Sequence, residues 1–341
     1  MKHSRVTWLV LCFFVIGLVC SATSVFAQAK QVTLRYSIFF PPPHKMSVLA
    51  TEWAKEIEKR TNGAVKINMY YSGTLTPPDK CYDGVVKGIS DIGMSPLSFT
   101  PGKFPFTEVF DYPLGNRSGV AATKLINEFL DKFQPREFDE VHILYFHSPG
   151  PSFPHTSKVA IRKLEDLKGL KLRGTGIVSK VITLLGGAPV GMPIGEVYDG
   201  ISRGVVDGAI ATIEALQGWK LGEVTKYTTL AYGSANMIAM SVVINKDKWN
   251  ALSPEVQKII TDVNREWIEK TAKAWDEIDE VAKQFALKLG HEFIPLSKEE
   301  DARWAKATSP LFDEYVKTRK AKGLPADDAL KFCQDRMKQL Q

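Results

Sequence analysis

The sequence predicts an α/β protein of two lobes joined by crossing segments. Strand-like and helix-like segments alternate between residues 31 and 230, a pattern that is typical of open α/β domains. The alternation is interrupted at the proline- and glycine-rich residues 147–155, which we interpret as a crossover between lobes. Residues 254–289 then carry apolar side chains at helical spacing over an unusual length. We expect this long C-terminal helix to pack across both lobes.

The first lobe is predicted from a strand–helix–strand unit followed by two helix–strand pairs. Period-two alternation or a short apolar run marks the strands, and apolar residues three and four apart mark the helices. The strands are predicted at residues 31–39, 65–71, 89–94 and 141–146, and the helices at residues 45–61, 79–87 and 119–133. A further strand at residues 238–244 is expected to return to this lobe.

The second lobe repeats the alternation from residue 158. Its strands are predicted at residues 159–161, 170–173, 189–190 and 205–211, and its helices at residues 178–185 and 195–202. Residues 227–230 precede the return of the chain to the first lobe. Helices are also expected at residues 299–319 and 326–340. We therefore divide the chain into lobe I (residues 28–150 and about 236–290), lobe II (about 151–235) and C-terminal helices (291–341) that pack across the lobes.

Residues 1–27 have the parts of a secretory signal peptide. Lys2 and Arg5 precede an apolar run at residues 8–19, and small residues follow up to Ala27. The apolar run is too short for a convincing membrane span. Cys20 offers a lipoprotein cleavage site as an alternative, but Val19 is large for the preceding position, so we favour cleavage after Ala27. The mature protein is expected in the periplasm.

Charge and cysteine content exclude some classes of protein. Without residues 1–27 the formal net charge falls from +6 to +4, and the basic residues are interspersed with acidic ones. No basic block or aromatic-basic stripe is present of the kind that follows a nucleic-acid backbone, so nucleic acid is not an expected partner. Cys81 and Cys333 are the cysteines left after cleavage. They can form one disulfide at most, which is no disulfide framework.

Arg173 ends the predicted strand 170–173, where a buried strand runs out toward a cleft. A guanidinium stays charged in a protein, and its planar fork of donors matches a carboxylate. A buried guanidinium therefore needs an anionic partner. The residues alone leave two partners open, a ligand carboxylate or a structural acid such as Glu196 or Asp207.

Motifs around Arg173 resemble those of the solute-binding proteins of tripartite ATP-independent periplasmic (TRAP) transporters, the DctP-like family. They lie at residues 163–173, 185–193, 196–198 and 204–208, with further matches at 53–57, 88–93, 223–227, 244–245 and 249–252. In that family two lobes of the periplasmic binding protein fold close over a small organic acid, and an arginine at the position of Arg173 grips its carboxylate. The resemblance implies delivery of the acid to small and large integral membrane subunits.

Departures from the family pattern narrow the expected ligand. The family's acid-sugar binders carry a second arginine in the loop after the strand that matches residues 141–146, and an asparagine where this chain has Ala211. We expect the ligand site around Arg173 to comprise Phe39, Ser95, Pro96, His147, Phe153, Ile194, Ala211, Glu214 and Asn236. Unpaired ligand hydroxyls against such apolar groups cost about 1–3 kcal/mol each. An aromatic or otherwise hydrophobic monocarboxylate is therefore favoured over a dicarboxylate or a sugar acid.

The sequence also allows two other functions. The same fold serves ligand sensing for a signalling partner. A periplasmic hydrolase that uses Ser95 or His147 is a further alternative, but no nucleophile elbow, phosphate-binding loop or metal-ligand motif supports an enzyme, a cofactor or a metal. Trp219 lies on a helical pattern and is expected to pack in the core.

Overall fold

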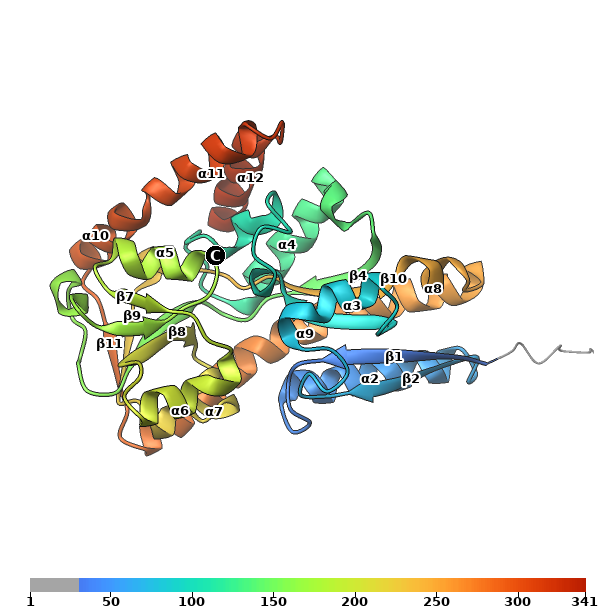
Figure 1. Ribbon diagram of the computed structural model, residues 1–341, viewed down its shortest axis with the longest axis horizontal. Helices are drawn as coiled ribbons and strands as arrows, with labels where there is room; N and C mark the ends of the chain where they lie inside the picture. Colours follow the sequence, from blue (N-terminus) through green and yellow to red (C-terminus); the bar gives the residue numbers. More distant parts are fainter. Residues whose placement is uncertain (1–30) are drawn as a thin grey trace, which may run out of the picture.

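The computed structural model describes residues 31–341, and the expected signal peptide, with Cys20, lies outside these residues. Two sheets form the centres of two lobes, and a long helix runs between them (Figure 1). The two-lobed α/β prediction is confirmed. In the described part of the chain, no helix combines the length and the apolar character that crossing a membrane requires.

The first sheet has the strand order β2-β1-β3-β10-β4. Its strands are β1 (Val32–Ile38), β2 (Val65–Tyr70), β3 (Ile92–Pro96), β4 (Val141–His147) and β10 (Met240–Asn245). Strand β1 pairs in parallel with β2 and β3, whereas β10 runs antiparallel to β3 and β4. Strand β10 comes late in the sequence, so the chain crosses between the lobes to complete this sheet. Helices α2 (Lys45–Arg60), α3 (Cys81–Val86), α4 (Gly119–Phe133) and α8 (Lys246–Asn250) belong to the same lobe.

The second sheet has the order β11-β9-β5-β8-β6-β7. Its strands are β5 (Ser152–Thr156), β6 (Lys171–Arg173), β7 (Ala188–Val190), β8 (Gly208–Thr212), β9 (Tyr227–Leu230) and β11 (Glu292–Pro295), and its helices are α5 (Ile177–Leu184), α6 (Val197–Ser202) and α7 (Ala215–Gly218). Single 3₁₀ turns link many elements, at Pro78–Lys80, Leu97–Phe99, Thr107–Asp111, Arg136–Phe138, Leu164–Leu167, Ile194–Glu196, Leu221–Glu223 and Tyr232–Ser234.

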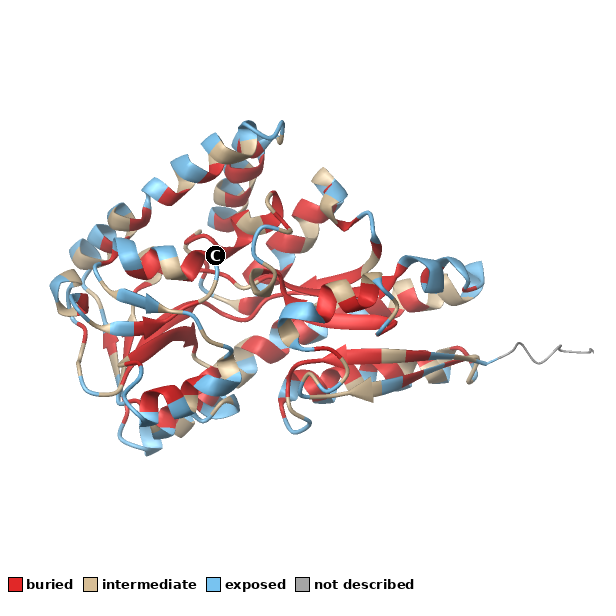
Figure 2. Cartoon of the chain, viewed as in Figure 1, coloured by how far each residue is buried: buried red, intermediate tan, exposed pale blue. Residues whose placement is uncertain are grey.

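Helix α9 (Pro254–Lys288) packs against both lobes. It begins at the Ser253 cap with proline in its first turn, and its 35 residues span about 50 Å at 1.5 Å per residue. It contacts α2, α4 and β4 in the first lobe and α7 in the second. The C-terminal helices are α10 (Lys298–Thr308), α11 (Pro310–Lys320) and α12 (Ala326–Gln339). Helix α10 packs against α5 and α12 packs against α4. Buried residues follow both sheets and the inner faces of these helices (Figure 2).

Several predicted elements are wrong. Residues 159–161 form no strand, whereas the expected crossover 147–155 contains most of β5. Pro154 is tolerated there because the pairing of β9 with β5 stops at His155, so the absent N–H of Pro154 is not required on that side. Residues 299–319 form two helices because Pro310 cannot continue α10. Strand β11 stands where mainly helices were expected. Cys81 and Cys333 are both buried and free, so the disulfide that the sequence left open is not formed.

Candidate functional site

A cavity lies between the lobes where corresponding strand ends of the two sheets meet. Pro96 and Arg173 end their strands, whereas Ser152 and Met240 begin strands that run in the opposite direction, and all four line the cavity. Carboxyl ends of parallel strands are where open α/β sheets bind ligands. The cavity has a volume of about 60 Å³, smaller than the roughly 150 Å³ that admits benzene. A ring-bearing ligand therefore does not fit the cavity as it stands, and the closed state that holds such a ligand must be wider than this arrangement.

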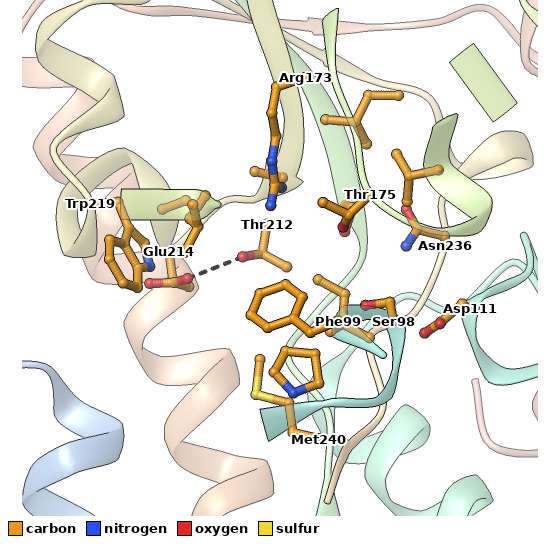
Figure 3. Close-up of a pocket in the computed structure, with 18 of the residues that line it drawn as sticks. Ser98, Phe99, Asp111, Arg173, Thr175, Thr212, Glu214, Trp219, Asn236 and Met240 are labelled. Atoms are coloured by element: carbon orange, nitrogen blue, oxygen red, sulfur yellow. Dashed lines mark hydrogen bonds between the residues drawn. The ribbon is translucent and has the colours of Figure 1, made fainter. Parts of the chain in front are cut away.

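Arg173 is buried at the end of β6 and its side chain points into the cavity (Figure 3). Its Nε donates to the carbonyl of Met192 at 3.0 Å. Within residues 31–341 no carboxylate forms an ion pair with it. Glu196 is exposed, and Asp207 accepts from the backbone N–H of Lys171. Burial lowers the pKa of Arg173 to about 10, so the guanidinium is still charged at neutral pH. The structural-acid alternative is therefore not how Arg173 is satisfied.

Glu214 joins the two lobes at the edge of the cavity. Its Oε2 lies 3.1 Å from Nε2 of His44, which caps α2 of the first lobe, and both side chains are buried. The His44 Nδ1 accepts from the backbone N–H of Met46, so Nε2 carries the proton and donates to Glu214. Thr212 also donates to Glu214, and the Glu214 N–H donates to Asp279 of α9. The carboxylate of Glu214 is thus engaged by protein groups in this closed arrangement.

Aromatic rings form the apolar wall of the cavity. Phe39 and Trp219 come from different lobes, and their rings are parallel to within 8° with centroids 6.3 Å apart. Phe40 and Phe99 flank Phe39 at 4.0 Å and 5.6 Å. Flat apolar groups pack well against such faces. Trp219 was expected to pack in the core, but it lies in the wall of the cavity.

Seven of the ten expected site residues line this cavity: Phe39, Pro96, Arg173, Ile194, Ala211, Glu214 and Asn236. Ser95, His147 and Phe153 do not. Neighbouring residues of a strand face opposite sides, so Pro96 and Ser152 reach the cavity while Ser95 and Phe153 face away from it. His147 accepts from the Trp275 indole N–H at 3.0 Å, and burial lowers its pKa to about 3.

Sequence reasoning missed most of the remaining lining residues: Phe40, Ser98, Phe99, Asp111, Ser152, Thr175, Val178, Ile210, Thr212, Ala215, Ile238 and Met240. Asp111 had a usable signal, because it is an acidic residue inside the apolar run Val109–Tyr112. Its carboxyl is buried, and burial raises its pKa to about 8, with the charge of Glu108 adding to the shift. Residues 31–341 contain no group of three histidine, cysteine or acidic side chains arranged to hold a metal ion.

Solved structures of similar proteins share this architecture. A TRAP solute-binding protein from an unidentified marine microbe, specific for aromatic acid ligands and bound to metahydroxyphenylacetate, is 28% identical with a TM-score of 0.86, covering 91% of this chain and 100% of that chain. A TRAP solute-binding protein of Rhodoferax ferrireducens in complex with benzoate is 25% identical with a TM-score of 0.85, covering 91% and 98%.

Sequence comparison points the same way. The C4-dicarboxylate-binding periplasmic protein DctP of Rhodobacter capsulatus is 26% identical over 301 residues, which is 86% of this chain and 90% of that protein. Residues 37–318 match the family described as bacterial extracellular solute-binding protein, family 7. The resemblance found in the motifs around Arg173 is thereby confirmed. The chain belongs to family 7 of the bacterial extracellular solute-binding proteins, the DctP family that serves TRAP transporters.

Proposed function

We propose that this protein captures an aromatic or otherwise hydrophobic monocarboxylate in the periplasm and delivers it to the small and large membrane subunits of a TRAP transporter. The observation that carries the proposal is Arg173, a buried cation in the inter-lobe cavity that has no carboxylate partner among residues 31–341. A ligand carboxylate supplies the missing anion. Its pairing with the guanidinium fork is strengthened because the closed cavity excludes water.

Closure of the lobes is the proposed mechanism. The carboxylate first meets Arg173 in lobe II, and the apolar body then lies against Phe39 of lobe I and Trp219 of lobe II. Since both lobes contact the ligand only when they are closed, binding shifts the population toward the closed state. Helix α9, which packs against both lobes, is the element across which this motion must occur.

A single negative charge on the ligand fits the lining best. Arg173 is the only cationic residue among the described residues that line the cavity, and Glu214 and Asp111 are acidic. A second carboxylate would therefore lack a partner and face like charge or a buried carboxyl. The aromatic acids bound by the marine and Rhodoferax proteins support this ligand class. The dicarboxylate-binding relative has comparable identity, so identity alone does not select the ligand.

A thermal-shift screen of residues 28–341 against small organic acids tests the proposal. A ligand that binds the native state raises the midpoint of unfolding by mass action. We expect the largest shifts from aromatic and branched monocarboxylates, and recovery of each acid unchanged after incubation, because no catalytic role is proposed. A dicarboxylate or sugar acid that outcompetes every such monocarboxylate would contradict the proposed ligand class.

A further inference from the structure

Two buried polar atoms in the cavity have no hydrogen-bond partner. They are Oδ1 of Asp111 and Oγ of Ser152, on side chains whose residues are 5% and 3% exposed. Leaving such an atom unsatisfied costs about 1–3 kcal/mol. The other unpartnered atoms found in residues 31–341 belong to Tyr36, Ser90 and Asn116, none of which lines the cavity. Two of these six unpartnered atoms thus lie where a ligand can reach them.

Asp111 and Ser152 are held beside the same short segment of chain. Ser152 donates its backbone N–H to the carbonyl of Asn236 at 3.2 Å, and the backbone N–H of Ala239 lies near enough to the Asp111 carboxyl to oppose the rise in its pKa. Asn236 also lines the cavity, and its amide donates to the carbonyl of Met237. We call Asp111, Ser152 and Asn236 the polar end of the cavity.

The polar end is separated from the other acidic group of the site. Figure 3 shows Asp111 and Asn236 on one side of the cavity and Glu214 and Trp219 on the other, with Arg173 entering between them. A ligand whose carboxylate pairs with Arg173 can therefore extend another group toward the polar end. Glu214 is already bonded to His44 and Thr212, whereas the polar end has free capacity.

We propose that the polar end binds one hydroxyl or carbonyl group of the ligand, so that the protein selects monocarboxylates that carry such a group. The inference rests on the proposed function, because Arg173 must orient the acid. A hydroxyl both donates and accepts, so it can bond to Ser152 or to Asp111, whichever protonation state the Asp111 carboxyl has. With its pKa near 8, Asp111 is largely protonated at neutral pH and does not repel the ligand. Sugar acids are still disfavoured because their other hydroxyls would face apolar groups.

Matched pairs of acids test the inference by calorimetry at pH 7. The pairs are benzoate with 3-hydroxybenzoate, phenylacetate with mandelate, and propionate with lactate. In at least one pair we expect the hydroxylated acid to bind about tenfold more tightly, as one or two hydrogen bonds predict. In D111L and S152A this preference should fall below twofold while the acid without the hydroxyl keeps its affinity. S234A is the matched control, since Ser234 is buried, bonded to the carbonyl of Ala231 and outside the cavity.

The outcomes separate this inference from the proposed function. The polar end does not bind the ligand if the wild-type protein binds both acids of every pair equally well. The same conclusion follows if D111L and S152A both keep the preference for the hydroxylated acid. Thermal unfolding of each ligand-free variant shows whether it is folded, and S152A removes too little volume to abolish folding. In R173A both members of every pair should lose binding. Full binding in R173A with the hydroxyl preference intact would contradict the role of Arg173 but support the polar end. If the wild-type protein bound none of the six acids, both the proposed function and the polar end would be contradicted.

Discussion

The two lobes contribute different chemistry to the same cavity. The second lobe supplies the buried cation Arg173 and the hydrogen-bonded pair Thr212 and Glu214 from its strand ends. The first lobe supplies mainly rings and apolar groups, such as Phe39 and Phe99 (Figure 3). The difference indicates that lobe II alone recognises the carboxylate, whereas the body of the ligand lies between the rings of lobe I and Trp219 of lobe II. Changes at Arg173 and changes in the aromatic wall should then have distinct effects.

The largest effect is expected from Arg173. R173A should weaken binding of every monocarboxylate by at least 100-fold, because a charge-assisted bidentate pair in a water-excluded site is lost. R173K should recover only part of the affinity, since an ammonium keeps the charge without the planar fork. Calorimetric titration measures both variants. R203A is a matched control, because Arg203 is exposed on lobe II. Wild-type affinity in R173A would show that lobe II does not recognise the carboxylate.

Trp219 tests whether the apolar body of the ligand is recognised separately. W219A removes a half-buried ring, so we expect roughly 5- to 30-fold weaker binding of aromatic acids. Propionate, which has no ring to place against Trp219, should change by less than twofold. Competition titrations with benzoate and propionate compare the two acids. An equal loss for both would mean that Trp219 supports the fold of the cavity and not the ring of the ligand.

The bond between His44 and Glu214 tests the closure itself. H44N keeps a side chain that caps α2 well but is too short to reach Glu214. We expect about 3- to 10-fold weaker binding through faster dissociation, since one bond that spans the lobes is lost. Stopped-flow dissociation and small-angle scattering of the free protein report this change. An unaltered dissociation rate with an unaltered distribution of open and closed forms would assign the bond no part in closure.

The smallest effect concerns pH and the stability of the ligand-free protein. Because burial raises the pKa of Asp111 to about 8, the folded protein retains a proton between about pH 4 and pH 8 that the unfolded chain has released. The free energy of unfolding contributed by this group therefore falls as pH rises through that window. Since asparagine does not titrate, the stability of the wild type relative to D111N should fall between pH 5 and pH 8.

The midpoint temperature of thermal unfolding measures this difference in stability, because 1 kcal/mol shifts the midpoint by about 2–4 °C. Glu108, on the same 3₁₀ turn, and Arg173, which shares the cavity, are present in both proteins, so their own titration largely cancels. A difference that is constant across the window would mean that Asp111 is ionised in the folded state throughout.

Local patterns were sufficient for much of the fold. Helix α4 begins and ends where the sequence pattern predicts, because Ser118 caps it and its apolar face is regular. Strand β5 was missed because Pro154 and the prolines just before the strand suggest a loop, and only pairing with β8 and β9 makes it a strand. The site shows the same limit. Phe153 and Ser95 were expected in the cavity, but a shift of one residue along a strand reverses the face on which a side chain lies.

The sequence by itself determined the fold class, the family and the position of Arg173, since these depend on short patterns and on motifs that are contiguous in the chain. Only the tertiary structure decided which side chains meet. His44 and Glu214 are 170 positions apart, and Asp111 and Ser152 line the same cavity although they belong to different lobes. Contacts of this kind depend on how two lobes close, and no local pattern of residues encodes that geometry.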